Sequence, residues 1–189
     1  MKVIQLHQEE KQLIMLAVEN NRQAQQQIYA KFSSKMLSVC RQYIKDIHHA
    51  EDVMITGFMK VFTNLKNFEH KGSFEGWIRR IMIYECIDFI RAKKNHIVHQ
   101  NNEDFIVSEK ESSYEMEDFA IDDIQYLIDN LPDGYKMVFN LYAIEGFKHH
   151  EIATMLKISE GTSKSQLSHA RKLLQHQLFE LKKRLNGTK

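Results

Sequence analysis

Residues 149–174 read HHEIATMLKISEGTSKSQLSHARKLL, and their spacing predicts two helices joined by a turn over 157–159. Ser159 can cap the second helix by accepting a hydrogen bond from the backbone N–H of Gly161 or Thr162. This is the geometry of a helix-turn-helix, whose second helix enters the major groove of DNA. The residues expected to pack between the two helices are Ile152, Ala153 and Leu156 from the first, and Ser163, Leu167, Ala170 and Leu174 from the second.

The outward face of the second helix carries small polar and basic side chains that can bond phosphates or base edges. A plain pair of packed helices in a bundle would show the same apolar spacing, but the density of such groups on one face favours DNA. These side chains belong to Thr162, Lys164, Ser165, Ser168, His169 and Arg171.

The composition agrees with an all-α protein. Among 189 residues there are one proline and seven glycines, fewer turn residues than a protein of many short strands needs. The sequence has no apolar run near the length of about 20 residues that crosses a bilayer, and no secretory signal, so we expect a cytoplasmic protein. Cys40 and Cys86 stand inside apolar helical patterns, which predicts two buried thiols in a reducing compartment.

Two all-helical domains and a flexible linker are expected along the chain. The first domain spans 1–94, with helices over 24–47 and about 50–65, then a break at FEHKGSFEGW and a third helix ending at RAKKN. An acidic linker follows over 95–118, and the second domain spans 119–189. Residues 101–125 contain nine acids and one base, whereas residues 148–189 contain nine bases and three acids. A basic module beside an acidic connector is typical of nucleic-acid binders.

In the second domain, apolar stripes predict two further helices before the helix-turn-helix. The first stripe is closed by Pro132 and the next stops near Gly146. The stripe residues are Ile121, Ile124, Leu127, Ile128 and Leu131, then Met137, Val138, Leu141 and Tyr142.

Between Phe68 and Lys94, aromatic residues alternate with bases, a composition suited to single-stranded nucleic acid. The alternative is that the aromatic residues simply form core, and for Trp77 and Phe89 we favour that interpretation. Contact with nucleic acid is favoured for the loop Lys71-Gly72-Ser73 and for the outward side chains of Arg79, Arg80 and Tyr84.

With these features together, the chain resembles an RNA polymerase sigma factor of the extracytoplasmic-function (ECF) subfamily. The resemblance covers about residues 20–183 and is carried by AEDVMITGFMKVFTNL, by FEHKGSFEGWIRRIMIYECIDFIR and, most specifically, by LPDGYKMVFNLYAIEGFKHHEIATMLKISEGTSKSQLSHARKLL. It implies a non-enzymatic protein without cofactor or small-molecule substrate, which binds core RNA polymerase and brings it to promoter DNA.

By this resemblance, the first domain would bind the clamp helices of the beta-prime subunit and open the minus-ten element. Its second domain would sit on the beta flap and read the minus-thirty-five element. An anti-sigma factor is a further partner that the resemblance implies.

The resemblance also assigns residues. It assigns polymerase binding to the helix over 50–65, at Glu51, Asp52, Phe58, Lys60 and Val61. The minus-ten element falls to the loop His70, Lys71, Gly72, Ser73 and Phe74 and to the strand-opening helix with Arg79, Arg80, Tyr84, Asp88 and Arg91. The minus-thirty-five element falls to Gly161, Thr162, Lys164, Ser165, Ser168, His169 and Arg171.

The chain departs from the family pattern in three places. Ile55-Thr56 stand where the family often has Gln-Glu, which removes polar groups from the polymerase contact. Tyr84 stands where the family usually has Asn, so that a base could be stacked instead of hydrogen bonded. His169 replaces a permanent cation, and duplex affinity should therefore weaken as pH rises and the imidazole loses its proton.

Two other functions predict different features. A zinc protease would need HExxH, but Thr154 stands where His150-Glu151-Ile152-Ala153 requires a second His, so no metal site is expected. An ordinary helix-turn-helix regulator would be a stable dimer that binds duplex DNA tightly without polymerase. A sigma factor would be a monomer when free, with weak and salt-sensitive DNA binding of its own.

Overall fold

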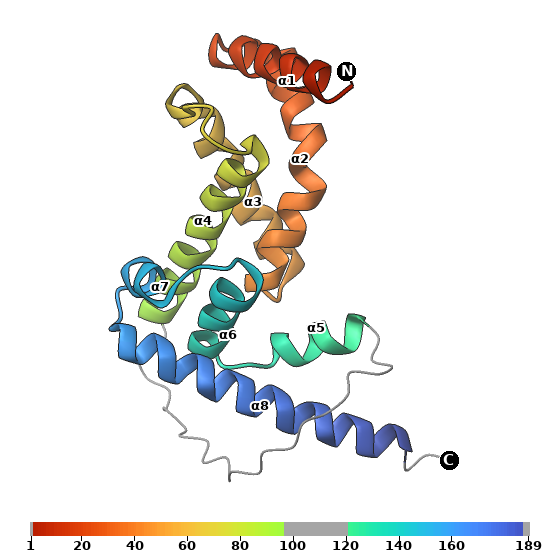
Figure 1. Ribbon diagram of the computed structural model, residues 1–189, viewed down its shortest axis with the longest axis vertical. Helices are drawn as coiled ribbons and strands as arrows, with labels where there is room; N and C mark the ends of the chain where they lie inside the picture. The colour runs from red at the N-terminus through yellow and green to blue at the C-terminus, as the bar shows by residue number, and fades with distance from the viewer. Residues whose placement is uncertain (1, 97–120, 187–189) are drawn as a thin grey trace. The chain divides into compact units, whose positions relative to one another are not determined.

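The computed structural model of the 189-residue chain describes residues 2–96 and 121–186. These residues form helices joined by short connections, which confirms the all-α prediction. The chain divides into two compact units, Met1–Ala92 and Lys93–Lys189, and each is described by itself (Figure 1). Most of the acidic linker predicted over 95–118 lies outside the described residues. Within the described residues, no helix combines the length and the apolar character needed to cross a membrane.

The N-terminal unit consists of α1 (Lys2–Val18), α2 (Arg22–Tyr43), α3 (Ile47–Asn64), the short 3-10 helix η1 (Leu65–Asn67) and α4 (Phe74–His96). The single helix predicted over 24–47 is wrong at its end, because α2 stops at Tyr43. Asp46 then caps α3, since its carboxylate accepts the backbone N–H of His49 at 2.9 Å. Sequence periodicity did not predict α1, which packs on α2 through the buried side chains of Ile14 and Ala17.

Close packing of α2, α3 and α4 forms the core of this unit. Gly57 of α3 lies so near α4 that a Cβ atom there would overlap the sulfur of Met82, so a side chain at this position would have to displace the Met82 side chain. Cys40 and Cys86 are both buried and reduced, as predicted. A hydrogen bond with Cys40, together with burial, raises the pKa of the Cys86 thiol far above its ordinary value.

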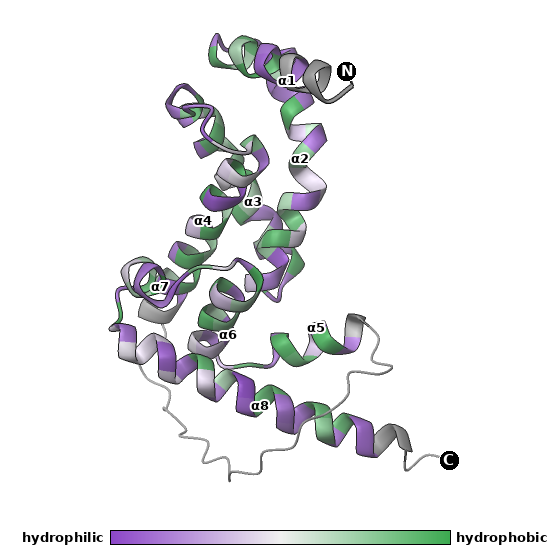
Figure 2. Ribbon diagram, viewed as in Figure 1, coloured by the Kyte–Doolittle hydropathy of each residue, from purple (hydrophilic) through white to green (hydrophobic). Residues whose placement is uncertain are grey.

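The C-terminal unit consists of α5 (Ile121–Asp129), α6 (Asp133–Phe139), the π-helix η2 (Asn140–Ile144), α7 (His149–Leu156) and α8 (Glu160–Asn186). The helix predicted to be closed by Pro132 ends earlier, at Asp129, and Pro132 directly precedes the first turn of α6, where its missing N–H costs no helical hydrogen bond. A buried ion pair joins the end of α5 to α6, with 2.7 Å between Lys136 Nζ and Asp129 Oδ1. Polar residues predominate along α8, which is the longest described helix (Figure 2).

Candidate nucleic-acid interface

The turn between α7 and α8 has the predicted helix-turn-helix form. Lys157 ends α7 in the left-handed conformation, with φ of 56°. Ser159 caps α8, because its Oγ accepts the backbone N–H of Thr162 at 2.9 Å. At the start of α7, the carboxylate of Glu151 accepts the backbone N–H of Lys148 at 2.8 Å. The Lys157 backbone N–H bonds to the carbonyl oxygen of Ala153, so local hydrogen bonds fix both ends of α7 and the start of α8.

The packing between α7 and α8 differs in part from the sequence prediction. Ile152 and Met155 are the buried residues of α7, whereas Ala153 and Leu156 are half-buried. On α8, the predicted Ser163, Leu167 and Ala170 are buried, and Leu174 is half-buried. The hydroxyl of Ser163 has a polar partner, because it is hydrogen bonded to Nδ1 of His149 at 2.9 Å.

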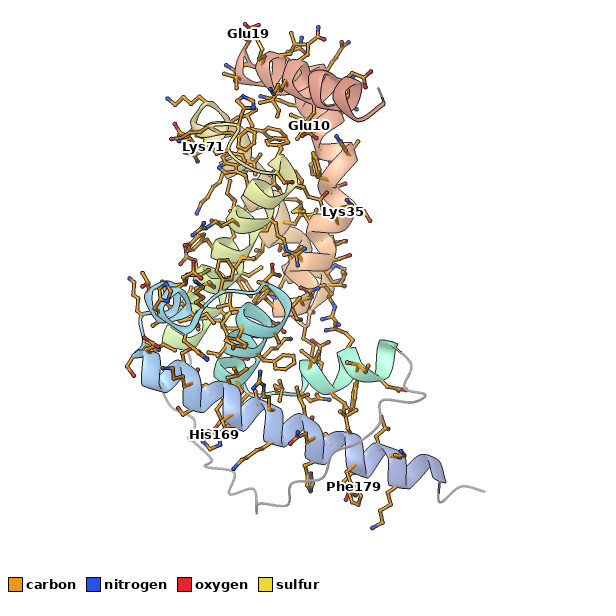
Figure 3. All side chains as sticks on the ribbon, in the orientation of Figure 1. Glu10, Glu19, Lys35, Lys71, His169 and Phe179 are labelled. Atoms are coloured by element: carbon orange, nitrogen blue, oxygen red, sulfur yellow. The ribbon has the colours of Figure 1, made fainter. Side chains whose placement is uncertain are left out.

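The outward face of α8 carries the predicted DNA-reading residues, which we call the reading face. The structure leaves Gly161, Lys164, Ser165, Ser168, His169 and Arg171 exposed and Thr162 half-buried. Lys164 forms an exposed ion pair with Glu160 at 2.8 Å, and the hydrogen bond from this ammonium lowers the pKa of the Glu160 carboxyl. His169 projects from α8 and stacks on Tyr135 of α6, with 5.6 Å between the ring centroids (Figure 3).

In the N-terminal unit, an exposed loop connects η1 to α4. His70 and Gly72 have positive φ values of 56° and 92°, and these give the loop its sharp course. Ser73 caps α4, because its Oγ accepts the backbone N–H of Gly76 at 3.3 Å. The side chain of Lys71 points outward and pairs with Glu69 at 2.7 Å (Figure 3). We call His70–Ser73 the capture loop.

Aromatic side chains support this loop from the core side. Phe74 is only 2% exposed and packs against Phe32 of α2, Phe68 and Trp77. The predicted contact of Phe74 with DNA is therefore corrected to a structural role, because its ring is not accessible. Trp77 is half-buried in the same cluster, as the core interpretation requires. Phe89 is also half-buried and contacts the ring of His49.

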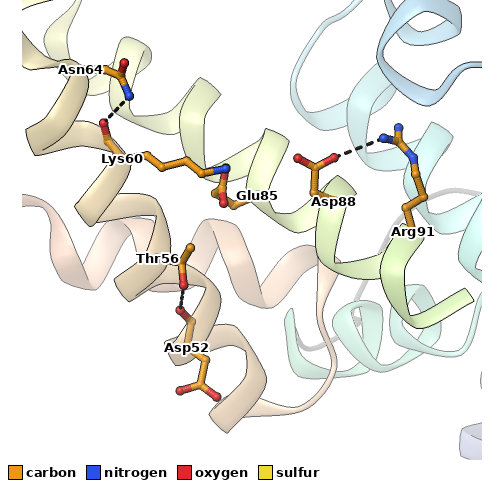
Figure 4. A network of polar contacts seen from close by, with 7 residues as sticks. All are labelled: Asp52, Thr56, Lys60, Asn64, Glu85, Asp88 and Arg91. Carbon is orange, nitrogen blue, oxygen red and sulfur yellow. Dashed lines mark hydrogen bonds and ion pairs between the residues drawn. The ribbon is translucent and has the colours of Figure 1, made fainter. Parts of the chain in front are cut away.

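The outward side of α4 continues from the capture loop. Arg80 and Tyr84 are exposed, and Arg79 and Arg91 are half-buried. Arg91 is hydrogen bonded to Asp88 at 3.2 Å, one turn back on the helix (Figure 4). Cationic and aromatic groups thus follow one another along this helix, in an arrangement that can hold unstacked bases and phosphates.

The predicted polymerase-binding helix, α3, presents some of its assigned residues and buries others. Asp52 and Lys60 are exposed and Glu51 is half-buried, whereas Phe58 is 2% and Val61 0% exposed. Phe58 and Val61 pack in the core, so the contact with polymerase predicted for these two side chains is corrected to support of α3 from inside.

Lys60 is already engaged within the unit. Its ammonium pairs with Glu85 of α4 at 2.5 Å, where Glu85 is almost fully buried (Figure 4). On the neighbouring turn, the Thr56 hydroxyl donates to the carbonyl oxygen of Asp52 at 2.9 Å. Ile55 and Met59 are 49% and 66% exposed, so the outer surface of α3 combines a carboxylate with two apolar side chains.

Comparisons with known proteins place both units in one family. Residues 28–96 match the family model "Sigma-70 region 2", and residues 121–174 match "Sigma-70, region 4". The RNA polymerase sigma-H factor of Pseudomonas aeruginosa is 24% identical, over 92% of this chain and 96% of the relative. The ECF RNA polymerase sigma factor SigW of Bacillus subtilis is 28% identical, over 79% of this chain and 86% of the relative. The chain belongs to the ECF RNA polymerase sigma factors.

Solved structures share the fold of this ECF sigma factor. The sigma factor RpoE of Bartonella quintana, crystallised with the anti-sigma factor NepR, aligns with a TM-score of 0.54 at 20% identity. That alignment covers 81% of this chain and 95% of RpoE. CnrH, solved in complex with the cytosolic domain of CnrY, aligns with a TM-score of 0.50 at 20% identity, over 89% of this chain and 96% of CnrH.

As a sigma factor, the protein directs transcription initiation. The helix-turn-helix lies within the region 4 match, and the capture loop lies within the region 2 match. In the part of the chain that the structure describes, no group of three or more His, Cys, Asp or Glu side chains could hold a metal ion. At the HExxH-like site, the Thr154 hydroxyl donates to the carbonyl oxygen of His150 at 3.0 Å.

One residue near the reading face escaped the sequence prediction. Tyr142 was expected in the buried stripe with Val138 and Leu141, but it is 36% exposed. The π-helical turn of η2 changes which side chains face the core after α6. The apolar spacing of the sequence does not predict that change. Tyr142 instead contacts Arg171 and His149, which belong to α8 and α7.

Proposed function

We propose that this ECF sigma factor binds core RNA polymerase through α3, opens the minus-ten element with the capture loop and α4, and reads the minus-thirty-five element with the reading face of α8. It works without cofactor and without catalysing a reaction of its own. The observation that carries the proposal is the reading face, where small polar and cationic side chains stand exposed on the second helix of a helix-turn-helix.

The contact with polymerase is proposed for the exposed outer surface of α3. Asp52 supplies a carboxylate, and Ile55 and Met59 supply apolar area that water covers in the free protein. A partner that covers this apolar area gains burial energy without any loss of internal contacts, because these side chains lie outside the core. The position of Ile55, where the family often has a polar residue, makes the interface more apolar than the family pattern.

Opening of the minus-ten element is proposed for the capture loop and α4. The loop backbone is fixed by the positive φ values of His70 and Gly72 and by the cap at Ser73, so it can hold a flipped base without first becoming ordered. Lys71 can then contact a phosphate, and Tyr84 can stack on a neighbouring base, since both side chains are exposed.

An anti-sigma factor is proposed as a regulatory partner. Support comes from two proteins of the same fold, RpoE with NepR and CnrH with the cytosolic domain of CnrY, which were solved as complexes. The exposed apolar side chains of α3 are available to such a partner as well as to polymerase. The proposed place of action is the cytoplasm, where core polymerase is found.

The test of polymerase binding is co-elution of the purified full-length chain with bacterial core RNA polymerase on a sizing column. We expect one peak containing both, which a known sigma factor displaces by competition. Asp52→Ala should weaken co-elution while the helical content stays unchanged, and Glu19→Ala, which removes another exposed carboxylate beside α1, should leave it unchanged.

Failure of the folded chain to co-elute, even with polymerase from its native host, would contradict the proposal. A stable dimer that binds duplex DNA tightly without polymerase would instead establish an ordinary helix-turn-helix regulator. The proposed sigma factor is a monomer when free, so the same column distinguishes the two functions.

A further inference from the structure

Tyr142 stands at the junction of three elements in the C-terminal unit. It belongs to η2, and its ring lies 5.6 Å from Cζ of Arg171, a residue of the reading face on α8. The ring also stacks on His149 of α7, with 4.6 Å between centroids and 23° between the planes. The tyrosine is therefore in contact with both helices of the helix-turn-helix.

The contacts continue from His149 into the core of the unit. Nδ1 of His149 is hydrogen bonded at 2.9 Å to Oγ of Ser163, which is fully buried where α7 crosses α8. The order of contacts is thus Ser163, His149, Tyr142 and Arg171. The buried end of this series is fixed by packing, and the other end is an exposed guanidinium.

The π-helical turn explains how Tyr142 reaches this place. The backbone N–H of Glu145 bonds to the carbonyl oxygen of Asn140 at 3.0 Å, which makes the wide five-residue turn of η2. Leu141 stays fully buried, while Tyr142 emerges beside α7 and α8. A continued α-helical stripe would have kept the tyrosine on the core side, as the sequence spacing predicts.

We propose that Tyr142 is a positioning residue for Arg171 in the recognition of the minus-thirty-five duplex. This inference rests on the proposed function of the reading face. A guanidinium is weakly hydrated and stacks well on aromatic rings, so the ring restricts the many rotamers of the arginine. The N–H groups at the edge of the guanidinium remain able to bond a phosphate or a base. Tyr142 itself need not touch DNA.

The test is a double-mutant cycle on the holoenzyme formed from the full-length chain and core RNA polymerase. The probe is the promoter duplex that the wild-type holoenzyme enriches from a random-sequence pool, and the readout is the dissociation constant of the closed complex. Arg171→Ala should weaken binding about 10-fold. Tyr142→Leu should weaken it about 2- to 5-fold, and Tyr142→Phe, which keeps the ring, should bind like wild type.

The decisive comparison is Tyr142→Leu in the Arg171→Ala background. If Tyr142 acts through Arg171, this second change should alter affinity by less than about 1.5-fold, because the group it positions is already gone. A general structural role would weaken binding by the same factor in both backgrounds, and that result would overturn the inference. Tyr126→Leu, at a 64% exposed tyrosine of α5, is the matched control and should leave affinity unchanged.

Two other outcomes concern the proposed function itself. If the pool yields no enriched sequence, the proposed role of the reading face is wrong. If Arg171→Ala has no effect, the proposed role of Arg171 is wrong. Either result would also overturn the inference about Tyr142. An effect of Arg171→Ala with a purely additive Tyr142→Leu would contradict the positioning role alone.

Discussion

The two units present their candidate DNA contacts in different ways. In the C-terminal unit, the assigned residues lie on one continuous helix, α8, whose buried and exposed faces alternate with helical period. In the N-terminal unit, the candidate contacts come from a loop and from α4, directly over a cluster of aromatic core residues. A substitution on the exposed face of α8 therefore alters a single side chain. A substitution in the capture loop or at the start of α4 can also disturb the core.

We relate this difference to the two proposed tasks, which are reading of a duplex and capture of a single strand. A rigid helix suits the regular major groove, because its side chains meet successive base pairs at fixed spacing. A flipped base needs a concave, preformed site, and the capture loop obtains its form from positive φ values and from the aromatic cluster beneath it. The predictions that follow test whether the two regions depend on the core in these different ways.

The largest effect is expected for Phe74→Ala. Removing this buried ring should reduce the free energy of unfolding of the N-terminal unit by about 4 kcal/mol, because it leaves a cavity between α2 and α4. Urea unfolding followed by the fluorescence of Trp77, the single tryptophan, measures this change. A stability near wild type combined with a loss of DNA opening would show that Phe74 is a contact residue after all.

Lys71→Ala is the counterpart of that change in the capture loop, which directly precedes Phe74. The side chain is exposed and pairs with the exposed carboxylate of Glu69, so we expect little change in stability. Promoter opening, measured by permanganate reactivity of thymines, should fall more than polymerase binding. Unchanged open-complex formation would contradict the assignment of the capture loop.

In the C-terminal unit, Lys136→Met should have the largest effect. It removes the ammonium from beside the buried carboxylate of Asp129, which keeps the weaker hydrogen bond from Gln125, and should cost about 3 kcal/mol of stability. Circular dichroism should show an earlier unfolding phase, while the transition reported by Trp77 stays in place. Adding Asp129→Asn to Lys136→Met should recover part of the loss, and a failure to recover any of it would contradict a dominant role of the buried negative charge.

A smaller effect is expected for Lys164→Ala on the reading face. It should cost about 1–3 kcal/mol of minus-thirty-five recognition, confined to one base position, if the ammonium meets a base edge. Binding to duplexes substituted at each position of the element measures this. An equal loss on every sequence would make Lys164 a phosphate contact. Glu160→Gln, which breaks the exposed ion pair and keeps the lysine, is the control.

The smallest effect concerns pH and the start of α3. The backbone hydrogen bond from His49, together with nearby histidines, holds the pKa of Asp46 below its ordinary value of 3.8. The folded state therefore gains stability from the ionised carboxylate above pH 3.8, and loses it as pH falls through the lower folded pKa. Asp46→Asn keeps a capping side chain, so it should reduce this acid dependence in denaturation curves; an unchanged dependence would exclude Asp46 as its source.

The helix-turn-helix could be predicted almost completely from the sequence, because apolar spacing, the turn at 157–159 and the cap at Ser159 are all local signals. The break predicted at FEHKGSFEGW is likewise a local signal, and α4 begins within it after the cap at Ser73. Resemblance to the family assigned residues by position, and position alone did not distinguish exposed Asp52 and Lys60 from buried Phe58 and Val61. Burial depends on how α3 meets the rest of its unit, which the spacing within one helix does not fix.

Other features depended on tertiary contacts or unusual backbone. The end of α2 at Tyr43 follows from competition between a continuing apolar stripe and the cap at Asp46, and the cap prevails. The exposure of Tyr142 follows from a π-helical turn, which changes the register within one stripe. The helix α1 lies over mixed polar sequence, and its two buried side chains pack on a neighbour that sequence alone did not reveal.

The most direct test of the account is transcription in vitro by core RNA polymerase on a genomic DNA library, with and without this protein, followed by mapping of the transcript ends. The account predicts new start sites that depend on the protein and share two sequence elements at constant spacing. Lys71→Ala should lower initiation at all of these sites, and Lys164→Ala should lower it according to the upstream element. Complete absence of protein-dependent start sites, with polymerase from the native host and folded protein, would contradict the account.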